Sequence, residues 1–145
     1  MNSVIELPFN RFLGIEPAAD PSQVLRLPSG AQYLNHLRTV HASAQLALAE
    51  ASSGEFLLRE LGSAAQVVPV VRRLESKFRK PANGAVTSTV SAPQVFEPLH
   101  TDLANKGRAL ITVAAERHDE SGAQTLSATV EWFITRQPNA SQDSV

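Results

Sequence analysis

The spacing of apolar residues divides the chain into a helical first half and a strand-rich second half. Residues 4–13 carry apolar side chains in what we expect to be a short helix or turn that ends at Gly14. The alternating run 23–27 predicts a short first strand. Residues 39–61 are the longest helical candidate. Because their first half is apolar on nearly every side, we predict a buried helix that stops at Gly62.

Beyond Gly62 the apolar residues recur at every second position, which is typical of β-strands. We predict strands at residues 66–79, 85–92, 108–117 and 125–135, with an irregular connection at 93–107. Turn-forming residues at 81–84 and 119–122 separate them.

Two of these strands allow a prediction of which side chains share a face. The strand 66–79 places Val68, Val70, Leu74 and Phe78 together, with Arg72 as a misfit. The last strand alternates most cleanly, and its predicted inward residues are Leu126, Ala128, Val130, Trp132 and Ile134. Its predicted outward residues are Thr125, Ser127, Thr129, Glu131 and Thr135.

One long helix and about five strands joined by turns predict an α+β fold, in which a curled antiparallel sheet wraps around a central helix. We expect a single domain over residues 1–145, with a lead-in at 1–22. The polar residues 138–145 are expected to form a flexible tail.

The composition narrows the class of protein. The chain has 145 residues, a formal net charge of -1 and no cysteine, which excludes disulfides, thiolate metal sites and a cysteine nucleophile. We find no net basic footprint of the kind that nucleic-acid binding uses, no signal peptide and no apolar run long enough for a membrane span. We therefore expect a cytoplasmic protein that binds neither nucleic acid nor membrane.

The segment from Asn35 to Glu50 resembles the signature of phenylacetate-type acyl-CoA thioesterases, which belong to the hotdog-fold superfamily. Asn35, Thr39, His41 and Glu50 stand at the matching spacings. The segments 8–15 (PFNRFLGI) and 78–84 (FRKPANG) are also similar to this family. The resemblance implies a hotdog fold and hydrolysis of an acyl-CoA or similar thioester. It implies no cofactor other than the coenzyme A carried by the substrate.

The chain departs from this signature at four positions. Arg38 stands where the family usually has glycine, and Ala42 and Ser43 replace two further glycines. Glu50 replaces the more common aspartate. The pattern is therefore closer to the less characterised branches of the superfamily, to which the fold transfers more surely than the chemistry.

Thioester hydrolysis needs a carboxylate that activates water or attacks the carbonyl, and donors for the developing oxyanion. Glu50 is the only acidic residue between Asn35 and Gly54, and burial would raise its pKa. The first amides of the helix, at Ala42 and Ser43, have no intrahelical acceptor and suit a thioester oxygen. However, Glu50 lies about 12 Å along the helix from Ala42, too far for both to act on one carbonyl.

The resemblance resolves this separation, because hotdog sites form between two subunits. It implies a homo-oligomer, a dimer or a dimer of dimers, in which Asn35 orients the water or the substrate carbonyl. The candidate catalytic residues are Glu50, Asn35, Ala42 and Ser43. The candidate substrate-binding residues are His41, Arg38, Gly54, Arg79 and Lys80. We expect no metal site, since His100 and His118 have no companion ligands at metal spacing.

Each assignment has a structural alternative. Glu50 could be a carboxylate paired across the dimer, and Asn35 could stabilise a turn. For His41 we favour a histidine at the helix entry, hydrogen-bonded to a loop. The basic residues Arg72, Lys77, Arg79 and Lys80, which form a local cluster with Arg73, are by default a solvated strand face, although arginine also favours the phosphates of coenzyme A. Arg38 could pair with an acid at the interface.

Two further functions stay open beside thioester hydrolysis. The substituted glycines favour a hotdog protein that binds an acyl group or coenzyme A without turnover. A dehydratase or hydratase acting on acyl thioesters would share the fold, but we do not find its usual local histidine-and-acid motif, and we rank it last.

Overall fold

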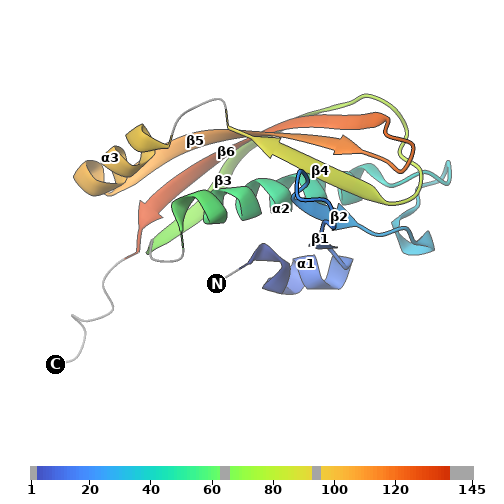
Figure 1. Cartoon of the computed structure of the whole chain (residues 1–145), viewed down its shortest axis with the longest axis horizontal. Helices are drawn as coiled ribbons and strands as arrows, with labels where there is room; N and C mark the ends of the chain where they lie inside the picture. Colours follow the sequence, from blue (N-terminus) through green and yellow to red (C-terminus); the bar gives the residue numbers. More distant parts are fainter. Residues whose placement is uncertain (1–2, 63–65, 93–95, 138–145) are drawn as a thin grey trace.

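The computed structural model describes residues 3–62, 66–92 and 96–137. Within them, a six-stranded antiparallel sheet has the order β1-β2-β4-β5-β6-β3, and the long helix α2 packs against one of its faces (Figure 1). The strands are β1 Glu16–Pro17, β2 Leu25–Leu27, β3 Val67–Phe78, β4 Val86–Ser91, β5 Arg108–His118 and β6 Gln124–Arg136. The helices are η1 Val4–Glu6, α1 Pro8–Leu13, η2 Ala31–Tyr33, α2 Ala42–Leu61 and α3 Glu97–Lys106. The predicted α+β hotdog fold is confirmed, with the two-residue β1 as an additional strand. The predicted tail at 138–145 lies outside the described residues.

Helix α2 is buried because its apolar residues surround the helix and small side chains let neighbouring backbone approach closely. Leu48, Ala49 and Leu57 have no exposed surface. The helix begins at Ala42, later than predicted, because His41 adopts an extended conformation and caps it. It ends before Gly62, as predicted.

The alternation predicted for the last strand is confirmed along β6, whose five predicted inward residues are all buried. The outward assignment of Thr125 is wrong. A register shift between Arg117 and His118 of the neighbouring strand lets Thr125 turn inward, where it is fully buried. Its hydroxyl donates a hydrogen bond of 2.8 Å to Oε1 of Gln45 on α2, which compensates for the burial.

The face predicted for β3 is also wrong, and the cause is a β-bulge. The pairing of β3 with β6 shifts register between Val71 and Arg73, so Arg72 is an extra residue in the strand. Residues directly opposite each other in an antiparallel pair lie on the same face of the sheet. Phe78 pairs with the buried Leu126, whereas Val68 pairs with Thr135 and lies on the opposite, outer face.

The connection predicted to be irregular contains helix α3. Leu99 and Leu103, four residues apart, are buried against the core formed by α2, β5 and β6. Gly107 ends the helix in the left-handed conformation, and the Arg136 guanidinium donates hydrogen bonds to the carbonyls of Leu103 and Ala104. The short apolar pattern of this segment was too weak to be recognised as a helix.

One buried cation lies on the inner face of the sheet. Arg117 has no exposed surface, and burial lowers the pKa of its guanidinium to about 9. Its Nη1 donates to the carbonyl of Glu116, while Nε and Nη2 have no partner among the described residues.

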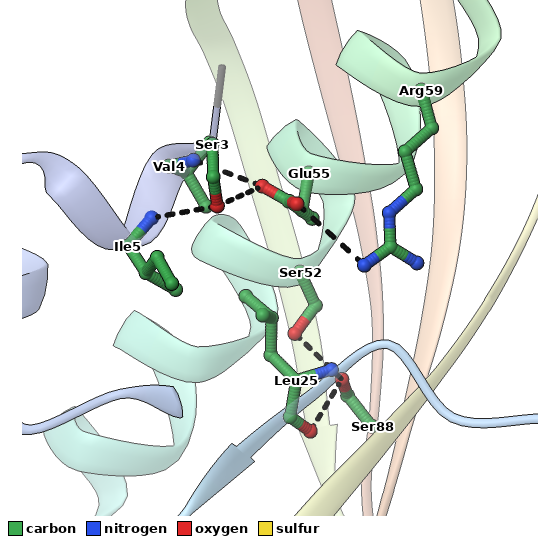
Figure 2. Close-up of polar contacts among 8 residues, drawn as sticks. All are labelled: Ser3, Val4, Ile5, Leu25, Ser52, Glu55, Arg59 and Ser88. Atoms are coloured by element: carbon green, nitrogen blue, oxygen red, sulfur yellow. Dashed lines mark hydrogen bonds and ion pairs between the residues drawn. The ribbon is translucent and has the colours of Figure 1, made fainter. Parts of the chain in front are cut away.

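Buried hydroxyls connect α2 to the sheet (Figure 2). Oγ of Ser88 on β4 lies 2.6 Å from Oγ of Ser52 on α2. The same Ser88 oxygen accepts from the backbone N–H of Leu25 and donates to its carbonyl, both at 3.1 Å. Ser88 therefore fastens β2 to β4 at the position where their ladder ends.

A second buried contact holds the N-terminal lead-in on α2 (Figure 2). The carboxylate of Glu55 accepts from the N–H of Val4 at 2.9 Å and from the hydroxyl of Ser3 at 3.0 Å. Arg59 lies one turn later, 3.6 Å from the same carboxylate. The lead-in is thereby fixed on the side of α2 that faces away from the broad part of the sheet (Figure 1).

Before α2, the chain makes a tight loop that contains an unusual backbone conformation. Arg38 has φ of 60°, the only positive value for a non-glycine residue in the described ranges. A side chain in this left-handed region costs about 1–2 kcal/mol, because its Cβ approaches the following carbonyl. The glycine that the related signature has here would avoid that cost.

We expect Ser88→Ala to lower the free energy of unfolding by about 1–3 kcal/mol, because the buried N–H of Leu25 loses its acceptor. Urea unfolding measures the change. Thr89→Ala, on the same strand and with no recorded side-chain hydrogen bond in the described chain, is the matched control and should change stability less. Equal losses in both variants would contradict this role of Ser88.

We expect Arg38→Gly to raise the free energy of unfolding by less than about 1 kcal/mol, since relief of Cβ strain is partly offset by the greater entropy of an unfolded glycine. Arg38→Ala removes the guanidinium but keeps Cβ, so it should show no gain in thermal unfolding. A loss of stability in Arg38→Gly alone would show that the loop is unstrained.

Candidate active site

The first half of the predicted site is organised by Asn35. Its Oδ1 accepts from the N–H groups of Leu37 and Thr39 at 2.9 and 3.1 Å, and its Nδ2 donates to the Thr39 hydroxyl at 2.9 Å. The Asn35 backbone N–H also bonds to the Thr39 carbonyl. Asn35 and Thr39 are four residues apart because hydrogen bonds between them close the loop that leads into α2.

This loop forms one wall of an open pocket of about 310 Å³, which we call the Asn35 pocket. The pocket brings together four of the predicted residues from two separate segments, Asn35, Ala42, Arg79 and Lys80. Phe78, at the end of β3, and Pro81 complete the opposite wall. Arg79 is held there by two hydrogen bonds from its guanidinium to Oγ of Ser127, at 3.0 and 3.2 Å.

The first residue of α2, Ala42, lines this pocket. His41 caps the helix through its Nδ1, which accepts from the N–H of Ser43 at 3.0 Å. The N–H groups of Ala44 and Gln45 bond to the His41 carbonyl. The N–H of Ala42 has no acceptor in the described chain, so of the two predicted oxyanion donors only Ala42 is available in this conformation.

Gln45 also lines the Asn35 pocket, and the sequence analysis missed it. It is 3% exposed, with its Oε1 held by Thr125 at 2.8 Å. A signal was available, since Gln45 is the only polar residue between Ser43 and Glu50.

Glu50 lies in a different, more enclosed pocket of about 130 Å³, which we call the Glu50 pocket. Gly54, also predicted, lines it together with Val4, Leu58, Pro69 and Trp132. No hydrogen bond or ion pair is recorded for the Glu50 carboxylate with any described residue. Burial raises the pKa of this carboxyl above its ordinary value.

The predicted residues thus fall into two groups that a single chain does not join. Arg38, His41 and Ser43 are exposed and line neither pocket. Two members of the basic cluster are engaged elsewhere, with Arg72 paired to Glu131 and Arg73 to Glu75.

The described part of the chain contains neither a candidate metal cluster nor a helix suited to span a membrane. No group of three or more His, Cys, Asp or Glu residues there could hold a metal ion. None of its helices is long and apolar enough to cross a membrane.

Residues 12–134 match the sequence family described as a domain of unknown function, DUF4442. No curated protein matches the chain. Among solved structures, a Pseudomonas aeruginosa protein of unknown function, described as a probable thioesterase, is 27% identical and has a TM-score of 0.75, over 92% of this chain and 91% of that one.

Two further structures share the fold at lower identity. The Haemophilus influenzae thioesterase is 15% identical, with a TM-score of 0.71 over 96% of this chain and 90% of its own. A Bacillus halodurans protein crystallised with CoA is 20% identical, with a TM-score of 0.67 over 87% of this chain and 74% of that one. The chain shares the hotdog fold of these thioesterase structures. Because the family match over residues 12–134 covers most of its length, the chain belongs to the DUF4442 family.

Proposed function

We propose that this protein hydrolyses an acyl-CoA thioester at a site shared by two copies of the chain. Glu50 comes from one copy, and Ala42, with the Asn35 loop, from the other. The observation that carries the proposal is the Glu50 carboxylate, which lies in an apolar pocket without a partner among the described residues. A partly buried carboxylate without a hydrogen bond or ion pair does not stabilise the fold, so a structural role does not account for it. Such a group is suited to act as a base or nucleophile.

The chemistry follows from the environment of Glu50. A carboxylate stripped of part of its hydration holds protons more tightly and is a stronger base than one in water. It removes a proton from the attacking water, or attacks the thioester carbonyl itself. In the first route Glu50 passes that proton to the thiolate of coenzyme A as the C–S bond breaks, and the carboxylic acid is released. In the second route the C–S bond is replaced by an anhydride between Glu50 and the acyl group, which a water molecule hydrolyses, giving its hydroxyl to the acyl group and its proton to the thiolate. In both routes the carbonyl oxygen gains negative charge before the C–S bond breaks.

The free N–H of Ala42 is the proposed donor for that negative charge. It occupies the first position of α2, where the helix dipole adds a partial positive charge. No side chain or backbone carbonyl in the described chain competes for it. The neighbouring Gln45 amide lines the same pocket and supplies a second polar group.

Strand β3 explains how two copies would join the pockets. It is an edge strand of the sheet, with Pro69 near its start in the Glu50 pocket and Phe78 at its end in the Asn35 pocket. Nine residues separate them, about 30 Å at 3.3 Å per residue. If two copies pair their β3 edges antiparallel about a two-fold axis, the start of one strand meets the end of the other. Each Glu50 pocket then adjoins a partner's Asn35 pocket.

The coenzyme A moiety is proposed to bind beside the Asn35 pocket, where Arg79 and the exposed Lys80 offer positive charge to its phosphates. The CoA present in the Bacillus halodurans structure supports this choice of carrier. Placing the carrier at this pocket leaves the Glu50 side free for the acyl group.

A second candidate function is binding of an acyl-CoA without turnover. It is favoured by the helix start, where the Ser43 amide is already bonded to His41 and only one donor remains. Tight binding of acyl-CoA by wild-type protein, with no thiol released from any member of a broad panel, would establish it instead of hydrolysis.

We expect Glu50→Gln to reduce kcat/KM for acyl-CoA hydrolysis at least about 100-fold, as loss of a general base does. Wild-type kcat/KM should rise with pH through a pKa above the ordinary glutamate value. Release of free thiol measures both. Glu60→Gln, an exposed change on the same helix, should leave the rate unchanged. Full activity in Glu50→Gln would refute the assignment.

The same variant should be more stable than the wild type at neutral pH. Because the folded pKa of Glu50 is raised, the folded state binds more protons than the unfolded state between the ordinary and raised values. Wild-type stability therefore falls as pH rises through this interval, and glutamine removes the loss. Thermal unfolding at pH 4 and pH 8 should show the advantage of Glu50→Gln only at the higher pH.

A mixing experiment tests whether the site is shared. Ala42→Pro removes the proposed oxyanion N–H at a helix position that tolerates proline, and Ala42→Val controls for the added bulk. Ala42→Pro and Glu50→Gln should each be inactive alone. After dissociation and equal mixing, half the dimers are hybrids with one intact site, so about a quarter of the wild-type activity should return. No recovery, with hybrids demonstrated by a mass-tagged subunit, would place both groups in one chain.

A further inference from the structure

We propose that the Glu50 pocket binds the acyl group and selects a short chain of up to about six heavy atoms that carries no negative charge. This inference rests on the proposed function and adds a substrate class to it. It is carried by the size of the pocket, its lining and the contacts that fix its walls.

The size of the pocket sets the upper limit. Its volume of about 130 Å³ is close to that of an apolar protein cavity of about 150 Å³ that binds benzene, a molecule of six heavy atoms. A dodecanoyl chain has about twice that number of carbons, so half of it would have to remain outside.

The lining excludes a negatively charged acyl group. Apart from Glu50, the only polar side chain in it is Asn10, whose Nδ2 already donates to the Val4 carbonyl at 2.9 Å. None of the residues that line the pocket is a cation. A second carboxylate on the acyl chain would therefore meet the negative Glu50 in a poorly hydrated space without a compensating charge.

The floor of the pocket is rigid and closely fitted. Trp132 is fixed by a 3.0 Å hydrogen bond from its Nε1 to Oγ of Ser53, which in turn donates to the Glu50 carbonyl at 2.8 Å. A Cβ on Gly54 would lie 3.3 Å from the Trp132 ring and 3.5 Å from Val4. Glycine at this position therefore adds space that any other residue would fill.

The roof of the pocket is the N-terminal lead-in. Val4 and Leu7 line the pocket, and Val4 is held in place by the buried carboxylate of Glu55 (Figure 2). Glu55 lies one residue after Gly54 on α2, so the same helical turn supplies the floor and the anchor of the roof. The chain-length limit thus depends on an attachment outside the reacting groups.

Turnover of saturated acyl-CoAs from acetyl to dodecanoyl tests the substrate class. In the wild type, kcat/KM should be greatest between butanoyl and hexanoyl and at least about tenfold lower for dodecanoyl. The reason is that a methylene that does not fit a hydrophobic pocket weakens binding of the transition state. Gly54→Ala should move the optimum to shorter chains, and Leu58→Ala should move it to longer ones. An optimum at dodecanoyl that neither variant moves would overturn the inference while leaving thioester hydrolysis intact.

A binding experiment separates this inference from the proposed function. Trp132 is the only tryptophan in the chain and lines the pocket, so its fluorescence reports occupancy without turnover. Titration with 1-butanol, 1-hexanol and 1-decanol should change the emission with the two shorter alcohols, more weakly in Gly54→Ala. If this occurs and no acyl-CoA is hydrolysed, the pocket assignment stands and hydrolysis fails. No change with any of the alcohols would overturn the assignment.

Discussion

The structure depends on the burial of the middle of helix α2 against one face of the sheet. Because α2 has almost no solvent-facing side along its middle, each polar group on it must find a partner within the protein. Ser52 bonds to Ser88, Gln45 to Thr125, Ser53 to the Trp132 ring nitrogen, and Glu55 to the lead-in. Against that background the unpartnered Glu50 carboxylate is distinctive, since the described chain contributes nothing that would neutralise it.

The same constraint explains which parts of the fold were predictable. A helix whose first half is apolar on nearly every side, the alternation along most of β6 and glycine at helix ends are local patterns, and they led to the correct elements. The wrong assignments at Thr125 and along β3 arose at register shifts, where one additional residue reverses the face of everything that follows. Helix α3 was missed because only Leu99 and Leu103 carry its apolar pattern.

The candidate site was predictable as a set of residues but not as a geometry. The family resemblance pointed to Asn35 and Glu50, and the predicted helix start to Ala42. The structure divides these residues between two pockets. The sequence could not reveal that the Ser43 N–H is already hydrogen-bonded to the His41 side chain, because this cap depends on the backbone conformation of His41. Gln45 was overlooked because its pocket-facing position depends on Thr125, 80 residues later.

The bulge at Arg72 has an evolutionary consequence. It divides β3 into a first half that exposes Val68 and Val70 on the outer face and a second half that brings Phe78 to the Asn35 pocket. Substitutions along the strand would alter one contact at a time. A one-residue deletion would instead reverse one half of the strand relative to the other, so this segment can vary in composition far more freely than in length.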